Sequence, residues 1–160
     1  MTTATAKERT YSYEGLFLFP QSALADMQGA VDHIKEILHR AHAQLIALKK
    51  WDERRLAYEI KGNKRGLYFL AYFTAPASRM VGIERDCNLS EKMLRALITR
   101  ADDLTADQMQ AADGQAALAD EIKLRRESPS AIPAKPAEDQ RDALADDMED
   151  GAEDVDISDL

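Results

Sequence analysis

The stretch WDERRLAYEIKGNKRGLYFLAYF, residues 51–73, decides how the rest of the chain is arranged. It consists of two strand-like runs joined by a turn at residues 61–66, which contains the Gly and Asn that a reversal between antiparallel strands requires. It also holds the only Trp of the chain, and seven Lys and Arg residues lie between Lys49 and Arg65. These features predict a basic β-hairpin around which the other elements pack.

The segments on either side of the hairpin complete an alternation of strands and helices. Strands are predicted over residues 11–19, 44–60, 67–73 and 93–100, and helices from the N-cap candidate Ser22 to about Ala43 and over 76–89. The order strand, helix, strand, strand, helix, strand is that of an α+β, ferredoxin-like split βαβ fold. The right-handed crossover rule places both helices on one face of a four-stranded antiparallel sheet, in which the first and third strands are central.

The opposite face of this predicted sheet is left without helices. Side-chain alternation assigns to it Leu16, Leu18, Tyr68, Leu70, Tyr72 and Arg95. An exposed face that is this apolar and aromatic usually marks an interaction site.

Charge and composition divide the chain into four parts. Residues 1–103 carry a balance of +3 and residues 104–160 a balance of −11, which together give the net charge of −8. We predict a disordered N-terminus over 1–10, a folded domain over 11–100 and a helical extension over 101–127, in which a capping box at Thr105 and Gln108 opens one helix. Residues 128–160 are predicted to form a Pro-containing linker and a disordered acidic tail.

Several classes of function are not supported by the sequence. Cys87 is the only cysteine, the N-terminus has no apolar leader, and no apolar run is long enough to cross a membrane, so the predicted location is cytoplasmic. His33, His39 and His42 are expected to be exposed on the first helix and do not form a metal site. No nucleophile elbow, phosphate loop or carboxylate pair is visible, so we expect neither an enzyme nor a cofactor or small-molecule substrate.

The basic residues of the hairpin allow two interpretations. Basic groups beside exposed aromatic rings suit nucleic acid, because the charges meet phosphates and the rings stack on bases. A solvated edge strand also uses Lys and Arg, since they block edge-to-edge aggregation. In addition, residues 65–72 partly match the signature strand of an RNA-recognition motif, which suggests single-stranded RNA binding as an alternative.

The pattern of residues resembles that of the bacterial small-subunit ribosomal protein S6 family. The matching positions are Tyr13-Glu14, Trp51, Arg54-Arg55-Leu56-Ala57-Tyr58, Ile60-Lys61, Gly66, Leu94-Arg95 and Arg100. The resemblance covers about residues 11–100 and leaves the C-terminal third unmatched. The chain departs from the family pattern at Glu59, where Pro is usual, and at Asn88, where Arg is usual.

The resemblance implies a structural role in the ribosome. Members of this family bind the central domain of small-subunit ribosomal RNA together with ribosomal protein S18. The implied RNA contacts are Lys49, Lys50, Arg54, Arg55, Lys61, Lys64, Arg65 and Arg95. The implied partner contacts are Trp51, Tyr58, Tyr68, Leu70 and Tyr72. A third possibility, an acylphosphatase-like hydrolase on the same scaffold, would need an Arg and an Asn after the first strand, and residues 19–22 (FPQS) supply neither.

Overall fold

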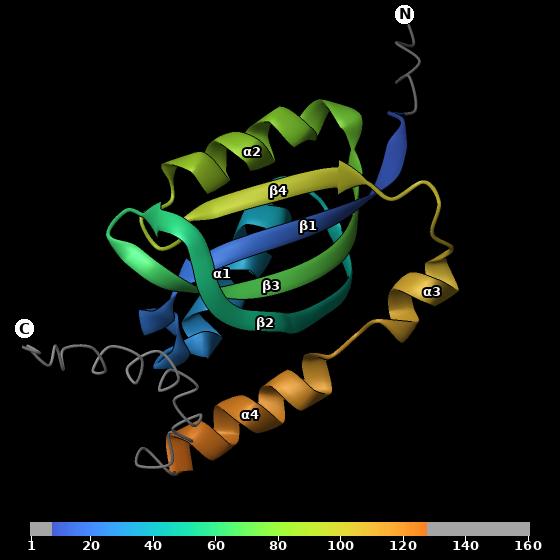
Figure 1. Cartoon of the computed structure of the whole chain (residues 1–160). Helices are drawn as coiled ribbons and strands as arrows, with labels where there is room; N and C mark the ends of the chain where they lie inside the picture. The colour runs from blue at the N-terminus through green and yellow to red at the C-terminus, as the bar shows by residue number, and fades with distance from the viewer. Residues whose placement is uncertain (1–7, 128–160) are drawn as a thin grey trace, which may run out of the picture. The chain divides into compact units, whose positions relative to one another are not determined.

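The computed structural model describes residues 8–127, and within them the predicted ferredoxin-like fold is confirmed (Figure 1). The strands are β1 (Thr10–Pro20), β2 (Gln44–Ile60), β3 (Asn63–Pro76) and β4 (Arg95–Arg100). The helices are α1 (Met27–Arg40), α2 (Met80–Leu89), α3 (Ala106–Ala111) and α4 (Gln115–Glu127), with 3-10 turns at Gln21–Leu24 and Ala77–Arg79. The predictions made for residues 1–7 and 128–160 lie outside the described residues.

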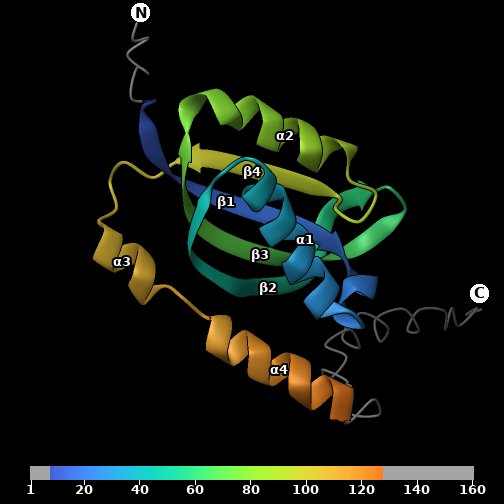
Figure 2. The same ribbon diagram turned by 180° about the vertical axis from the view of Figure 1, so that it is seen from behind.

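The sheet has the predicted topology, because its strand order is β2-β3-β1-β4 with β1 and β3 in the centre. All neighbouring strands are antiparallel. Helices α1 and α2 lie against one face (Figure 2), where Phe17, Phe69 and Phe73 of the central strands are completely buried with Ile34 and Ile83 of the helices. The alternation of side chains along β1 and β3 therefore aims one face of each strand into a single core.

The turn of the hairpin is shorter than residues 61–66. Lys61 and Gly62 both have positive φ, 47° and 79°, and Ile60 pairs directly with Asn63. This is the two-residue reversal whose twist matches that of antiparallel strands. The Asn63 side chain donates to the carbonyl oxygens of Ile60 and Lys61, which holds the turn in place.

Helix α1 begins later and ends earlier than the prediction from Ser22 to Ala43. Ser22 lies in a 3-10 turn, and Asp26 is the cap, since its carboxylate accepts from the Gly29 N–H at 3.0 Å. At the other end His42 adopts a positive φ of 56°, and the Ala43 N–H donates to the Leu38 carbonyl. That pair of features is a Schellman closure, which stops the helix at Arg40.

The segment before β4 was predicted as strand and is instead a buried connection. Met93 is 1% exposed, and its N–H donates to the Ser90 hydroxyl, which also lies 2.7 Å from His33 Nε2. The prediction that His33 is exposed is wrong: the side chain is half-buried and links α1 to the end of α2. Helix α2 likewise begins at Met80, because Ala77–Arg79 forms a 3-10 turn after Pro76.

The extension forms two helices, and the predicted single helix over 105–127 is wrong. The capping box of Thr105 and Gln108 is confirmed at the start of α3. Gly114 separates α3 from α4, and its N–H donates to the Leu48 carbonyl of β2 at 3.2 Å. Since a Cβ on Gly114 would lie 2.7 Å from the Cβ of Lys49, the chain needs glycine where it crosses the edge of the sheet.

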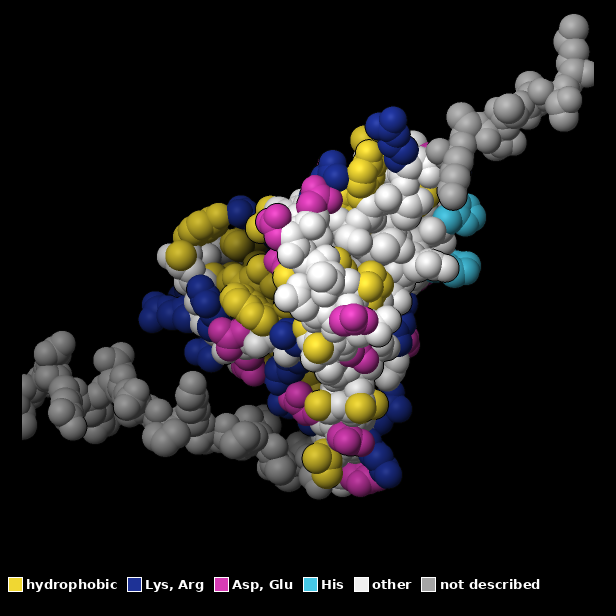
Figure 3. Space-filling model, turned by 90° about the vertical axis from the view of Figure 1, so that its right-hand side faces the viewer, with side chains coloured by type: hydrophobic (Ala, Val, Ile, Leu, Met, Phe, Trp, Pro, Cys, Tyr) yellow, Lys and Arg dark blue, Asp and Glu magenta, His cyan; other side chains and the backbone are white. Residues whose placement is uncertain are grey.

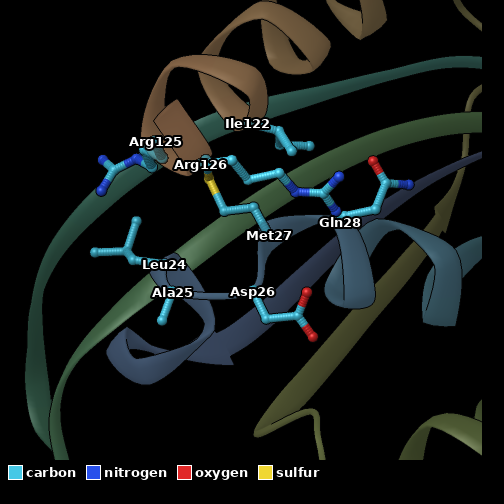
Figure 4. Close-up of a pocket in the computed structure, with 8 residues that line it drawn as sticks. All are labelled: Leu24, Ala25, Asp26, Met27, Gln28, Ile122, Arg125 and Arg126. Atoms are coloured by element: carbon cyan, nitrogen blue, oxygen red, sulfur yellow. The ribbon is translucent and has the colours of Figure 1, made fainter. Parts of the chain in front are cut away.

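The two helices of the extension pack on opposite faces of the sheet. Met109 of α3 is buried with Leu70 and Tyr72 on the face that lacks α1 and α2. Leu118 and Ile122 of α4 join the main core. Figure 4 shows the end of α4 beside the start of α1, around a small cavity of about 70 Å³. The extension is thus packed on the domain at both ends.

Candidate nucleic-acid and protein interface

A long bulge in β2 shapes the exposed part of the hairpin. Arg55 pairs with Arg65 and Ile60 with Asn63, so residues 56–59 have no pairing partners in β3. Extra residues on one strand bend it and redirect its side chains. The bend carries Tyr58 over the sheet to β4, where Arg95 donates to the Tyr58 hydroxyl and places its guanidinium 5.2 Å from the ring centre.

The bent hairpin and the sheet enclose a groove of about 410 Å³. Its lining is mostly apolar and comes from all four strands: Leu16, Leu18, Leu56, Ala57, Tyr58, Ile60, Tyr68, Arg95, Ala96 and Leu97. Figure 3 shows a hollow lined by hydrophobic side chains, with Lys and Arg at its outer rim. Leu97 remains 62% exposed and Tyr58 59% exposed, so the groove offers a large apolar surface to a partner.

Arg54 and two aromatic rings form one wall of this surface. Trp51 packs edge-to-face on Tyr68 with ring centres 5.7 Å apart. The Arg54 guanidinium lies 5.9 Å from both ring centres and 3.8 Å from the Asp52 carboxylate. These contacts orient a cation that is still mostly exposed, which is the arrangement that phosphate or carboxylate recognition uses.

The structure separates the predicted RNA contacts into two groups. Six remain exposed on the hairpin and β4: Arg54, Arg55, Lys61, Lys64, Arg65 and Arg95. Lys49 and Lys50 do not, because the extension covers them. The Lys50 ammonium lies 2.6 Å from the Glu121 carboxylate of α4, and Lys49 packs beneath Gly114.

Glu121 is held in its charged form by the neighbouring cations. Burial alone would raise the pKa of this carboxyl, but hydrogen bonds and charges from Lys50 and Arg125 outweigh it and lower the pKa. Lys50 is therefore already paired within the described part of the chain.

The predicted partner contacts are also divided. Trp51, Tyr58 and Tyr68 border the groove, but Leu70 and Tyr72 are only 8% and 9% exposed. The expectation that these two lie on an open face is wrong, because Met109 of α3 packs on them. The Tyr72 hydroxyl donates to the Glu14 carboxylate at 2.8 Å, and burial together with this acceptor raises the pKa of Tyr72.

Three features of the interface were missed at the level of sequence. Leu56 and Leu97 line the groove, and the bulge that brings Leu56 there has no simple sequence signal. Asp113 accepts from the Leu48 N–H at 2.9 Å and fixes the extension to β2. The capping box at Thr105 was a visible signal of a helix start, and Gly114 was a visible signal of a break in that helix. The sequence did not show that this break would contact Leu48 of β2.

Comparison with known proteins matches the folded body to one family. The sequence model of the family Ribosomal protein S6 matches residues 12–100. The chain belongs to the ribosomal protein S6 family. The match confirms the resemblance seen over about residues 11–100 and leaves residues 101–160 outside the family domain.

Individual relatives agree with this family assignment. The small ribosomal subunit protein bS6 of Protochlamydia amoebophila is 32% identical over 93 residues, which span 58% of this chain and 82% of that protein. The bS6 protein of Campylobacter lari is 33% identical over 89 residues, 55% of this chain and 72% of its own length. A crystal structure of 30S ribosomal protein S6 from Thermotoga maritima superposes with a TM-score of 0.54 at 22% identity, covering 64% of this chain and 98% of that one, and supports the fold.

Membership of the S6 family places the chain among ribosomal proteins of the small subunit, whose roles are structural rather than catalytic. Within residues 8–127 no helix is long and apolar enough to cross a membrane.

Proposed function

We propose that this S6 family member binds the central domain of small-subunit ribosomal RNA together with ribosomal protein S18, and that it does so without catalysis. Two observations together carry the proposal. The first is the family match over residues 12–100, and the second is the group of exposed basic side chains on the hairpin and β4, here called the hairpin arm, which lies beside the apolar groove. The arm supplies a surface for phosphates, and the groove supplies a surface for a protein.

The hairpin arm is the RNA contact in this proposal. Arg54, Arg55, Lys61, Lys64, Arg65 and Arg95 are exposed at the bend and tip of the hairpin and on β4. Within 8–127 the only carboxylate in an ion pair with any of them is Asp52, which lies 3.8 Å from Arg54. A partly exposed pair at this distance contributes little, so phosphates can displace it.

The groove is the S18 contact in this proposal. An apolar centre with exposed Leu97 and Tyr58, bordered by Trp51 and Arg54, has the composition typical of protein interfaces, in which aromatic residues and Arg are enriched. The proposal leaves Lys49, Lys50, Leu70 and Tyr72 out of both contacts, because the extension half-covers the two lysines and α3 buries Leu70 and Tyr72.

Single-stranded RNA binding on the sheet face remains the second candidate. It is favoured by the exposure of Trp51 and Tyr58, two rings on which bases could stack. It is weakened by the burial of Phe69 and Tyr72, because the corresponding strand of an RNA-recognition motif presents its rings to solvent.

The salt dependence of RNA binding tests the proposal. A central-domain RNA fragment is titrated with the full chain, with and without S18, at several salt concentrations. Arg54→Ala with Arg55→Ala should weaken binding and make the slope of log affinity against log salt shallower by roughly 1.5, since each lost phosphate contact removes about 0.7 to 0.9. Arg40→Ala with Arg85→Ala removes the same charge from the helical face and should leave the slope unchanged.

Two results would distinguish the alternatives. An unchanged slope in the Arg54 and Arg55 variant would exclude the hairpin arm as the RNA contact. Tight binding to unstructured RNA without S18, lost on Trp51→Ala, would favour the second candidate.

A further inference from the structure

One carboxylate oxygen of the extension collects two cations at the edge of the sheet. Glu121 Oε1 on α4 lies 2.6 Å from the Lys50 ammonium of β2. The same oxygen accepts from Arg125 Nε at 3.3 Å and from Arg125 Nη2 at 3.2 Å. Within residues 8–127 neither cation has an ion pair with any other carboxylate. Two cations from different elements of the fold therefore share a single anionic atom.

Packing on both sides keeps this cluster in place. Leu118 and Ile122 bury one face of α4 in the main core, so Glu121 and Arg125 lie at a fixed distance from β2. Figure 4 shows Arg125 and Arg126 pointing in opposite directions from the end of α4. Arg126 consequently takes no part in the cluster, although it is the next residue along the helix.

The arrangement is that of an occupied phosphate site. Proteins bind phosphate with Arg, which offers a planar fork of donors, and with Lys, which offers a point charge. Glu121 supplies the negative charge that a phosphate would bring. Burial opposes its charged form, but hydrogen bonds and charges from Lys50 and Arg125 lower its pKa, so Glu121 is anionic at neutral pH and competes with an incoming anion.

The cluster adjoins the hairpin arm. Lys50 precedes Arg54 by four residues on β2, a separation of roughly 13 Å in an extended strand. The side chains of Lys50, Glu121 and Arg125 are all partly exposed, so an anion in solution can reach them. RNA bound along the hairpin arm would therefore meet a further phosphate site at Lys50 if Glu121 did not occupy it.

We propose that Lys50 and Arg125 form a latent phosphate site that Glu121 keeps closed, so that the extension makes an autoinhibitory contact with the RNA surface. The closed contact confines RNA to the bend and tip of the hairpin. This inference rests on the proposed function, because it requires RNA to bind along the hairpin arm. Its cation Arg125 lies outside the matched family domain.

Removal of one charge tests the proposal in the full chain. Glu121→Gln preserves the size of the side chain and opens the site. The variant's log affinity for the central-domain RNA fragment should fall more steeply with log salt, by roughly 0.7 to 0.9, since one phosphate contact is gained. Asp120→Asn removes the same charge from the neighbouring exposed position and should leave the slope as in the wild type.

Second substitutions in the Glu121→Gln background identify the site. Lys50→Ala and Arg125→Ala should each return the slope to the wild-type value, whereas Arg126→Ala should retain the gain. Lys50→Ala in the otherwise wild-type chain should not change the slope, because Glu121 already occupies this lysine. A gain that survives Arg125→Ala would overturn the shared site. A shallower slope for Lys50→Ala alone would overturn the closure by Glu121.

Amine acylation measures the closure without RNA. In the free full-length protein Lys50 should react more slowly than the exposed Lys61, as followed by mass spectrometry of its peptides. Glu121→Gln should increase the rate at Lys50, and Asp120→Asn should not. Equal rates at Lys50 in all three proteins would overturn the proposal.

The RNA titrations separate the failure of this inference from that of the proposed function. If the Arg54→Ala, Arg55→Ala variant has a shallower slope while Glu121→Gln behaves like Asp120→Asn, the latent site is absent and the proposed function stands. If the chain does not bind the RNA, or if the hairpin variant keeps the wild-type slope, the proposed function fails and the autoinhibitory role of Glu121 fails with it.

Discussion

The Asp113 carboxylate accepts a hydrogen bond at 2.9 Å from the backbone N–H of Leu48, a residue 65 positions earlier. The next residue, Gly114, donates its own N–H to the Leu48 carbonyl. Both outward main-chain groups of Leu48 on the edge strand β2 are therefore satisfied by the extension. An edge strand with free groups is a site for unwanted pairing, so this contact protects the sheet as well as fixing α3 and α4 to it.

Gly114→Ala should destabilise the protein at the link between α3 and α4. The new Cβ would meet the Lys49 Cβ at 2.7 Å, which forces the extension away from β2. Gly82→Ala in α2 is the matched control, because a Cβ there meets nothing within 4 Å and should add roughly 0.5 to 1 kcal/mol of stability. Urea unfolding of both variants gives the two changes in free energy, and stabilisation by both would show that the close approach is absent.

Helix α4 should contribute to the stability of the whole domain. Leu118 is 4% exposed in the main core, and Leu118→Ala should cost about 2 to 4 kcal/mol of unfolding free energy. Leu124 on the same helix is 65% exposed, and Leu124→Ala should change the unfolding free energy by less than about 0.5 kcal/mol. Equal, small effects in chemical denaturation would mean that α4 is not packed on the domain in solution.

The fold was predictable because the patterns that specify its strands and helices lie within short stretches of sequence. Alternation in residues 11–19 and 67–73 assigned Phe17 and Phe69 to the core, and the strand order followed from general rules of connection. The same alternation placed Leu70 and Tyr72 on the correct face, but it could not show that Met109 of a later helix would bury them. That burial depends on contacts between residues distant in sequence, which no periodicity encodes.

The candidate interface was predictable only in part for the same reason. The hairpin and its basic residues follow from residues 51–73, whereas the bulge over 56–59 and the contact of Tyr58 with Arg95, 37 residues away, have no signal in that stretch. Lys50 looked the same as Arg54 in the sequence, and only the position of Glu121 distinguishes them.

His33 should make stability depend on pH. Burial, and secondarily the charge of Lys92, lowers the pKa of His33 below its ordinary value of 6.5. The unfolded chain then takes up the proton first, so stability is complete above about pH 6.5 and declines as the pH falls towards the lowered folded value. His33→Gln should reduce this decline, measured by urea unfolding between neutral and mildly acidic pH. His39→Gln, an exposed change on the same helix, should preserve it, and an equal effect of both variants would contradict the assignment.

Cys87 should be unreactive in the native protein. The thiol is 4% exposed, and burial, with smaller contributions from Asp86 and Glu84, raises its pKa to about 11. Almost no thiolate exists at pH 8, so a disulfide reagent should modify Cys87 only after urea unfolds the chain. Rapid modification without denaturant would show that α2 opens readily.

Association with the ribosome tests the central claim most directly. The full chain is incubated with small ribosomal subunits that lack their S6 protein, washed with salt, and sedimented. We predict that the wild type and the Arg40→Ala, Arg85→Ala control sediment with the subunits, while the Arg54→Ala, Arg55→Ala variant is depleted from the pellet. Wild-type protein that stays in the supernatant would contradict the assignment of this chain to the small subunit.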